Sequence, residues 1–284
     1  MKRIYTLLCV LLTLFTACKK HTYERKSSST IAPVVRTINN AAIELSATQG
    51  RTPSIVFISG FGSELTNWKD VYQGLPASYS KFAYNRAGVG KSSNVAGIRD
   101  AATIAAELKN ILDAADIKPP YILVAHSMGG IYARMFYHLN KNLVKGMVLV
   151  DATHENQLDT LLSSIPQPQR DLIYSEMVAA NDHLLSTMPA GSTKEEFRAN
   201  FTTNYQQIKQ WPSISSIPLY VISSRKVTPE NPSFVIDIQT ALHQQWAIQA
   251  GSLGRFVTTE KSGHYIQVEE PQLVITGINW VIAR

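Results

Sequence analysis

Short apolar runs alternate with amphipathic stretches along most of this chain of 284 residues. Apolar runs bounded by Gly, Pro or polar residues predict buried strands, and these lie at 55–58, 81–85, 121–124, 144–150, 217–222 and 255–259. Apolar positions at helical spacing predict helices, and the clearest lie at 103–115, 131–139 and 272–283. Strands that alternate with helices predict an α/β fold, with a mostly parallel central sheet and helices on both faces.

One stretch, approximately residues 155–212, breaks this alternation. It contains helical segments such as 171–180, interrupted by Pro166, Pro168 and Pro189, and shows no pattern typical of a strand. A structureless loop of this length is unusual inside a compact domain. We therefore predict that residues 34–284 form one domain in which this stretch is a helical cap over one end of the sheet; a long surface loop is the alternative.

The first residues have a different pattern. Lys2 and Arg3 precede an apolar run at 4–17, which is shorter than the about 20 residues needed to span a bilayer. This predicts a signal peptide over residues 1–17. The polar residues that follow, up to residue 33, predict a flexible tether.

The end of this apolar run reads Leu-Phe-Thr-Ala-Cys and resembles the lipobox of bacterial lipoproteins, with Phe15 where Leu is usual. The resemblance implies that Cys18 is lipidated and begins the tether, residues 18–33. It also implies a protein anchored by lipid in the bacterial cell envelope, on the periplasmic or surface face. An ordinary signal peptide is the alternative.

Charge and cysteine content exclude several classes of function. The formal net charge is +6, but six Lys or Arg and one Glu precede residue 31, which leaves 21 basic and 20 acidic side chains in the rest. A nearly neutral domain argues against a nucleic-acid partner. Because Cys9 and Cys18 are the only cysteines, the mature domain has no internal disulfide, no Cys-ligated metal and no cysteine nucleophile. With scattered histidines as well, we expect no metal and no cofactor.

Residues 121–130, Tyr-Ile-Leu-Val-Ala-His-Ser-Met-Gly-Gly, are the most informative stretch. A predicted strand leads into Ser127, and two glycines then begin a predicted helix. This arrangement is typical of the strand–turn–helix that holds a nucleophilic serine in a strained backbone between small neighbours. Ala125 stands where Gly is usual. A tight turn with an idle serine is the alternative.

On these residues the chain resembles the α/β-hydrolase family, over most of its mature length. Residues 59–62, Ser-Gly-Phe-Gly, follow an early strand as the oxyanion loop does in that family, with Ser59 in place of the common His. Residues 85–92, Asn-Arg-Ala-Gly-Val-Gly-Lys-Ser, resemble the family's Asp-Arg-x-Gly-x-Gly-x-Ser turn. Ser-Gly-His at 262–264, followed by Glu270-Pro271, resembles the late loop that delivers the catalytic His.

The resemblance implies acyl transfer, with Ser127 as the nucleophile and His264 as the general base. The backbone N–H groups of Phe61 and Met128 would form the oxyanion hole. His126 follows the predicted strand directly, and we expect it to pack rather than to act in catalysis.

The acid that orients the histidine is harder to assign. Many family members carry it after the strand predicted at 217–222, but here no carboxylate follows until Glu230 and then Asp237. The preceding strand ends at Asp151, a position that some members of the superfamily use. We predict Asp151 as the acid, with Glu230 as the main alternative; the remaining alternatives are Asp237 and a site without such an acid.

Apolar side chains recur at near-helical spacing late in the predicted cap. We expect most of them to pack the cap against the sheet, and some to line an apolar acyl pocket. They are Phe197, Phe201, Tyr205, Ile208 and Trp211.

Together these features predict a serine hydrolase that cleaves a carboxylic ester of a small apolar or acyl substrate. A thioesterase, an amidase or a C–C hydrolase would use the same residues. A non-catalytic binding protein on the same fold is the alternative from another class. The expected membrane contact is through the N-terminal lipid only.

Overall fold

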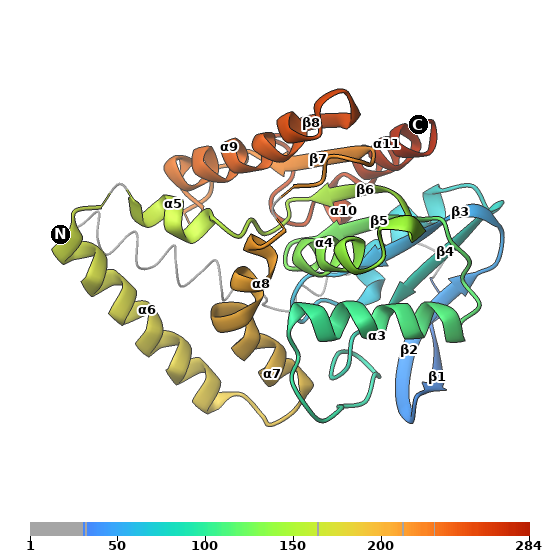
Figure 1. Ribbon diagram of the computed structural model, residues 1–284, viewed down its shortest axis with the longest axis horizontal. Helices are drawn as coiled ribbons and strands as arrows, with labels where there is room; N and C mark the ends of the chain where they lie inside the picture. Colours follow the sequence, from blue (N-terminus) through green and yellow to red (C-terminus); the bar gives the residue numbers. More distant parts are fainter. Residues whose placement is uncertain (1–30, 32, 164, 212, 230) are drawn as a thin grey trace.

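The computed structural model describes residues 31, 33–163, 165–211, 213–229 and 231–284 (Figure 1). The predicted signal peptide, Cys18 and nearly all of the predicted tether lie outside these residues. Within them, eight strands form a single sheet. The strands are β1 (Val34–Ile38), β2 (Ala41–Thr48), β3 (Arg51–Ile58), β4 (Tyr79–Tyr84), β5 (Tyr121–His126), β6 (Val144–Val150), β7 (Leu219–Ser224) and β8 (Gly254–Thr259).

The order across the sheet is β1-β2-β4-β3-β5-β6-β7-β8. From β4 to β8 every neighbouring pair is parallel, whereas β1 pairs with β2 and β2 pairs with β4 in antiparallel fashion. The sheet is therefore mostly parallel, as predicted. The parallel strands bring their carboxyl ends to one edge, where α/β proteins place their ligand sites.

Helices cover both faces of the sheet (Figure 1). The helices α3 (Ala101–Ala114), α4 (Gly129–Leu139) and α9 (Ser233–Gln249) pack on one face. The other face carries α2 (Lys69–Gly74), α10 (Ile266–Glu269) and α11 (Pro271–Ile282). Short 3-10 turns complete the body, at η1 (Leu65–Trp68), η2 (Lys141–Leu143) and η4 (Gly251–Leu253).

The central strand β5 shows why the parallel strands read as unbroken apolar runs. Its side chains alternate between two cores: Leu123 and Ala125 pack toward α3 and α4, whereas Ile122 and Val124 pack toward α11. All six of its residues are buried. A strand that is covered on both faces needs apolar side chains at every position.

Several elements of the body were not predicted: strands β1 and β2, helix α9 and the short helices α2 and α10. Strands β1 and β2 mix polar and apolar residues, and β1 is largely exposed. Helix α9 buries polar side chains together with apolar ones, among them Gln239 and His243. It therefore lacks the clean apolar stripe that periodicity detects.

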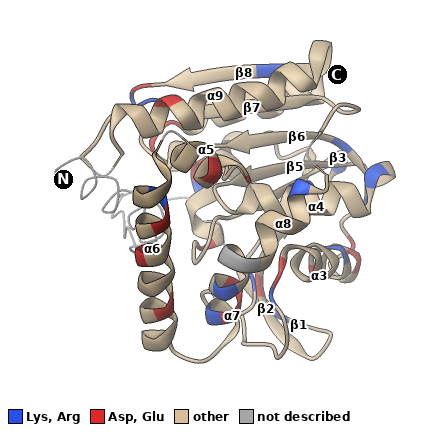
Figure 2. Cartoon of the chain, turned by 60° about the vertical axis from the view of Figure 1, so that its left-hand side comes forward, with Lys and Arg blue, Asp and Glu red and all other residues tan. Residues whose placement is uncertain are grey.

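The segment between β6 and β7, which we call the insertion, contains helices and, in its described residues, no strand. Its helices are α5 (Gln157–Ser163), α6 (Gln167–Thr187), α7 (Ser192–Ala199), the π-helical turn η3 (Asn200–Asn204) and α8 (Tyr205–Lys209). Helix α6 stands farthest from the sheet, while α8 lies against α3 and α4 (Figures 1 and 2). None of the described helices has the length and apolar character needed to cross a membrane.

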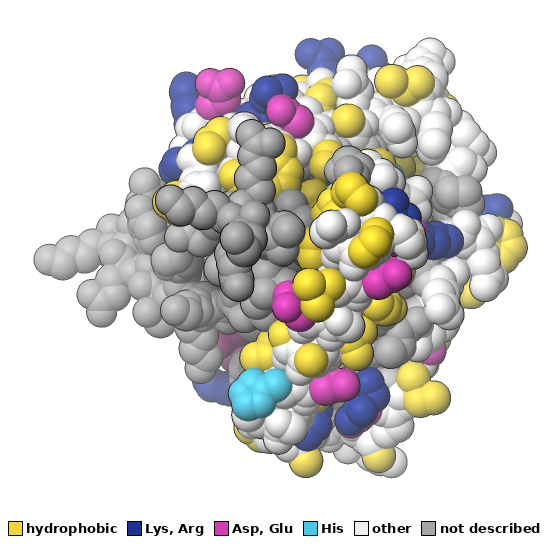
Figure 3. All heavy atoms as spheres, turned by 90° about the vertical axis from the view of Figure 1, so that its left-hand side faces the viewer, with side chains coloured by type: hydrophobic (Ala, Val, Ile, Leu, Met, Phe, Trp, Pro, Cys, Tyr) yellow, Lys and Arg dark blue, Asp and Glu magenta, His cyan; other side chains and the backbone are white. Residues whose placement is uncertain are grey.

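Basic and acidic side chains are interspersed over the described elements (Figure 2). The face that carries α6 also exposes hydrophobic side chains among charged ones (Figure 3). On α6 itself the exposed apolar residues include Leu172, Tyr174 and Val178.

Candidate active site

Ser127 lies in the tight turn between β5 and α4. Its φ angle is 53°, in the left-handed region that costs a non-glycine residue about 1–3 kcal/mol. Its N–H donates to the carbonyl of Val150 at 3.2 Å, and its carbonyl accepts from the N–H groups of Gly130 (2.9 Å) and Thr153 (3.0 Å). The end of β6 and the start of α4 thus hold the strained turn from both sides.

Glycine is required around this turn because backbone segments meet there. A Cβ atom on Gly129 would overlap with the carbonyl oxygen of Ile58 at the end of β3. A Cβ atom on Gly60 would lie 3.0 Å from the Cβ of Ser127. The loop at 59–62 therefore packs directly against the serine turn.

Asp151 is the first residue after β6, the strand beside β5. It is 2% exposed and also has a left-handed backbone, with φ 42°. Its Oδ2 accepts a hydrogen bond from Nδ1 of His264 at 2.7 Å. Its Oδ1 accepts from the N–H of Ser224 (2.9 Å) and from Nε2 of Gln239 (2.8 Å). Three donors from three different elements therefore fix the carboxylate.

These contacts keep Asp151 ionised despite its burial. Burial by itself opposes the charge. The hydrogen bond and charge interaction with His264, the charge interaction with His243 and the N–H of Ser224 outweigh it, so the pKa of Asp151 lies below its ordinary value. The ionised carboxylate at this position accepts a hydrogen bond from the Nδ1–H group of His264. Nε2 of the neutral ring is then free of a proton and basic.

His264 lies in the loop between β8 and α10, with its side chain 35% exposed. Two hydrogen bonds hold its loop at the two residues just before the histidine. The carbonyl of Ser262 accepts from Oγ of Ser224 at 2.8 Å, and the N–H of Gly263 donates to Oε2 of Glu269 at 3.1 Å. The end of β7, where the commoner acid would follow, thus holds both the acid and the histidine loop.

His126 is buried beside His264. Its ring centroid lies 4.5 Å from that of His264, and its Nε2 is 2.8 Å from the carbonyl oxygen of His264. Burial, and then the charge of His264, lower the pKa of His126 to about 3. The ring therefore stays neutral and donates from Nε2. The side chain of His126 packs in the interior, as predicted, and it also forms a hydrogen bond with the backbone carbonyl of His264.

The loop at 59–62 follows β3 and reaches the serine turn through Gly60. Trp68 donates from Nε1 to Oγ of Ser59 at 3.0 Å, and Arg86 donates to the carbonyls of Ser59 (2.6 Å) and Gly60 (2.7 Å). Phe61, the residue predicted to supply an oxyanion donor, therefore lies in a loop whose two preceding residues are held by Trp68 and Arg86.

The other carboxylates considered from the sequence have different surroundings. Asp237 is exposed, and its Oδ1 lies 3.5 Å from Nη2 of Arg225. Glu230 lies outside the described residues. Of the three, only Asp151 is seen to contact His264 within the part of the chain that the structure describes.

The apolar residues of the insertion divide into two groups. Phe197 and Ile208 are buried, and Tyr205 packs partly buried against the main core. Trp211 does not pack on the sheet, because it is 44% exposed and stacks on the ring of His138 with centroids 3.4 Å apart. The side chain of Phe201 lies outside what the structure describes. The ring of Phe197 lies 5.6 Å from that of Phe61.

Sequence reasoning missed three residues that shape the site. Ser224 and Gln239 bind Asp151, and Arg86 binds the loop at 59–62. Arg86 belongs to the turn at 85–92, whose Asn-Arg-Ala-Gly-Val-Gly-Lys-Ser sequence is a recognisable motif, whereas nothing in the sequence pattern singles out Ser224 or Gln239. Among the described residues, no group of three or more His, Cys, Asp or Glu side chains is placed to hold a metal ion.

Comparison with known proteins decides the family. The sequence model of the alpha/beta hydrolase family matches residues 55–276, which include Ser127, Asp151 and His264. The chain belongs to this family. Membership in the alpha/beta hydrolases supports hydrolase activity in general.

One relative in sequence and two solved structures match most of this alpha/beta hydrolase. The uncharacterized protein YqjL of Bacillus subtilis is 26% identical over 268 residues, which cover 92% of this chain and 87% of that protein. The epoxide hydrolase CorEH superposes with a TM-score of 0.63 at 15% identity, over 89% of this chain and 98% of that one. A thermophilic esterase from Thermogutta terrifontis superposes with a TM-score of 0.60 at 16% identity, over 88% of this chain and 98% of that one.

Proposed function

We propose that this alpha/beta hydrolase cleaves a carboxylic ester through an acyl-enzyme intermediate, with Ser127 as nucleophile, His264 as general base and Asp151 as the orienting acid. The observation that supports it most is the contact of 2.7 Å between Asp151 and His264, made at the sheet edge where the strained turn presents Ser127. An ordinary structural turn does not need a buried carboxylate aimed at a partly exposed histidine.

In the proposed reaction, Oγ of Ser127 attacks the carbonyl carbon of the ester while Nε2 of His264 takes its proton. The N–H groups of Phe61 and Met128 stabilise the negative oxygen. The intermediate collapses, and the alkoxide leaves with the proton from His264. Water, activated by the same histidine, then releases the acid. Asp151 stabilises the imidazolium in both halves.

The apolar surroundings favour a substrate with an apolar acyl part. Phe61 and Phe197 pack side by side where the insertion meets the loop at 59–62, and we propose that the insertion acts as the cap of the site. Thioesters, amides and C–C bonds remain alternatives with the same triad. Epoxide hydrolases of this superfamily use an aspartate as nucleophile, so Ser127 argues against that chemistry for this chain.

We also propose that the enzyme acts in the bacterial cell envelope, held by a lipid on Cys18. The support is the lipobox-like end of the apolar N-terminal run. In this arrangement the substrate is a small molecule that reaches the site from the aqueous side or from the membrane surface.

Labelling with a fluorophosphonate tests the proposed function. The full chain, kept in detergent, is treated with the probe and its intact mass is read. We expect one adduct on the wild type, none on Ser127→Ala, and one on Ser175→Ala, which alters an exposed serine of α6. No adduct on folded wild type would favour the binding-protein alternative. An adduct that persists in Ser127→Ala would assign the nucleophile elsewhere.

A further inference from the structure

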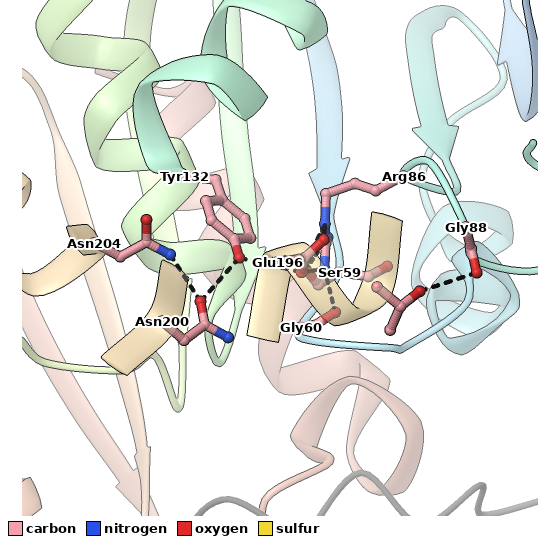
Figure 4. A network of polar contacts seen from close by, with 9 residues as sticks. Ser59, Gly60, Arg86, Gly88, Tyr132, Glu196, Asn200 and Asn204 are labelled. Carbon is pink, nitrogen blue, oxygen red and sulfur yellow. Dashed lines mark hydrogen bonds and ion pairs between the residues drawn. The ribbon is translucent and has the colours of Figure 1, made fainter. Parts of the chain in front are cut away.

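A buried ion pair lies directly behind the loop at 59–62 (Figure 4). Arg86 follows β4, and Glu196 belongs to helix α7 of the insertion. Their side chains are 2% and 1% exposed, and Nη2 of Arg86 lies 2.7 Å from Oε1 of Glu196. The Nε of Arg86 also donates to both carboxylate oxygens, at 3.2 and 3.0 Å. The guanidinium therefore has a fixed orientation.

The opposite side of the same guanidinium binds the backbone of the loop. Its Nη1 donates to the carbonyl of Ser59 at 2.6 Å, and its Nη2 donates to the carbonyl of Gly60 at 2.7 Å. One buried side chain thus fixes two consecutive carbonyl groups just before Phe61.

The geometry of the peptide bond makes the second of these contacts important. The carbonyl of Gly60 and the N–H of Phe61 belong to one planar trans peptide unit, so they point in opposite directions. A carbonyl held by Arg86 therefore aims the N–H of Phe61 away from Arg86. A hydrogen bond from a charged donor also polarises the peptide, which strengthens its N–H as a donor.

The other predicted oxyanion donor is fixed in the same way. The N–H of Met128 shares a peptide unit with the carbonyl of Ser127, and that carbonyl accepts from Gly130 and Thr153. The carbonyl of each donor peptide therefore accepts two hydrogen bonds. For the Gly60–Phe61 peptide they come from Nη2 of Arg86 at 2.7 Å and from the N–H of Ser63, within the same turn, at 3.3 Å. Of these two donors only Arg86 is buried and charged, and it is held by the insertion.

Helix α7 is itself fixed against the body around this pair. Tyr132 of α4 donates to Oε1 of Glu196 at 3.1 Å, and Thr193 donates to the carbonyl of Gly88 at 3.1 Å. Phe197, the neighbour of Glu196, packs its ring on that of Phe61. Helix α7 therefore contacts the loop at 59–62 through the side chain of Phe61 and, by way of Arg86, through its backbone.

We propose that Arg86 and Glu196 are positioning residues of the oxyanion hole, so that helix α7 of the insertion sets the direction of the Phe61 N–H. This inference rests on the proposed function. Arg86 does not touch the reacting atoms; it acts through the Gly60–Phe61 peptide. Loss of the pair weakens stabilisation of the oxyanion and leaves the proton transfer between Ser127 and His264 in place.

A second buried pair of the same kind provides a matched control. Arg134 of α4 binds Glu155 with both Nη atoms, at 2.5 and 2.9 Å, and the side chains are 1% and 2% exposed. Neither residue belongs to the loop at 59–62 or to the proposed triad. The double variants Arg86→Gln/Glu196→Gln and Arg134→Gln/Glu155→Gln each remove both charges, so neither leaves an isolated buried charge.

The test compares these two double variants with the wild type in three measurements on the full chain. They are thermal unfolding, ester hydrolysis over a range of pH, and the ratio of kcat/KM for an aryl ester to that for its thionoester. Sulfur accepts hydrogen bonds less well than oxygen, so this ratio reports the strength of the oxyanion hole. The single variant Arg86→Lys, which keeps the charge but offers only one nitrogen, is measured as well.

We expect the Arg86/Glu196 variant to lose about 10- to 100-fold in kcat, with KM within about 3-fold, a smaller ester-to-thionoester ratio and an unchanged pH profile. The kcat of the Arg134/Glu155 variant should fall less than about 3-fold. If the Arg86/Glu196 variant does not fold, a smaller ester-to-thionoester ratio in Arg86→Lys would still support the positioning role of Arg86. Equal losses in both double variants, or an unchanged ratio in a folded Arg86 variant, would overturn the inference. A wild type that no fluorophosphonate labels would overturn the proposed function first, and this inference with it.

Discussion

Replacing Asp151 by Asn is the sharpest test of the proposed acid, because the structure fixes how the new side chain must lie. Two donors, the N–H of Ser224 and Nε2 of Gln239, approach Oδ1 of residue 151 at 2.9 and 2.8 Å. Both need an acceptor, so the amide oxygen of an Asn takes this place. Its NH2 group then faces Nδ1 of His264.

An NH2 group in that position reverses the hydrogen bond to the histidine. Nδ1 of His264 must now accept, so the ring proton moves to Nε2, where it blocks the uptake of the serine proton. Removing the carboxylate also removes the charge that stabilises the imidazolium. We expect kcat to fall about 10⁴-fold, which corresponds to about 5.5 kcal/mol of transition-state stabilisation.

The assay is steady-state hydrolysis of an aryl ester, with thermal unfolding to show that the variant is folded. Asp237→Asn is the matched control, because that carboxylate is exposed and pairs with Arg225. The kcat of this variant should stay within about 2-fold of the wild-type value. Glu230→Gln tests the alternative acid. A folded Asp151→Asn that keeps more than a tenth of the wild-type rate, or a comparable loss in Glu230→Gln, would refute the assignment.

Two further predictions concern stability and the membrane. The free energy of unfolding should decrease as the pH falls from 7 to 5. Burial lowers the pKa of His126 to about 3 and that of His154 to about 4, so both rings stay neutral in the folded protein. In the unfolded chain the same two rings become protonated near pH 6.5, which favours the unfolded state. Each histidine contributes about 2 kcal/mol to the loss at pH 5, measured by denaturant unfolding. Detergent phase separation should place the wild type in the detergent phase and Cys18→Ala in the aqueous phase.

Each of these predictions has a matched control. His154→Gln should flatten the pH dependence, whereas the same change at the exposed His183 should not; equal slopes in the two variants would contradict the argument. Cys9→Ala, which alters the cysteine inside the predicted signal peptide, should partition as the wild type does. Retention of Cys18→Ala in the detergent phase would show that another feature holds the protein to the membrane.

The parallel part of the sheet could be predicted because its strands are buried on both faces. The apolar run at 144–150 coincides with β6 (Val144–Val150), and the run at 121–124 is the start of β5. Where one face is exposed or polar groups are buried, the pattern is lost. Strand β1 has its first four residues exposed, and α9 buries Gln239 and His243. Neither segment therefore shows a clear periodicity of hydrophobic residues in the sequence.

The sequence by itself determined the parts of the site that are local. The strand before Ser127, the small residues after it and the carboxylate at the end of the next strand are each set by residues that adjoin in the chain. Parallel pairing of β5 with β6 then places Ser127 and Asp151 one position beyond the paired residues His126 and Val150. The neighbourhood of these two residues therefore follows from the order of the strands.

Only the tertiary structure decided which groups satisfy the buried carboxylate and fix the loop at 59–62. Gln239 lies 88 positions from Asp151 and Glu196 lies 110 positions from Arg86, yet each pair is in direct contact. A buried charge is stable only where donors or an opposite charge surround it. These partners are brought together by helices α9 and α7 as they pack, and hydrophobic periodicity along the chain does not record which polar side chain will meet which.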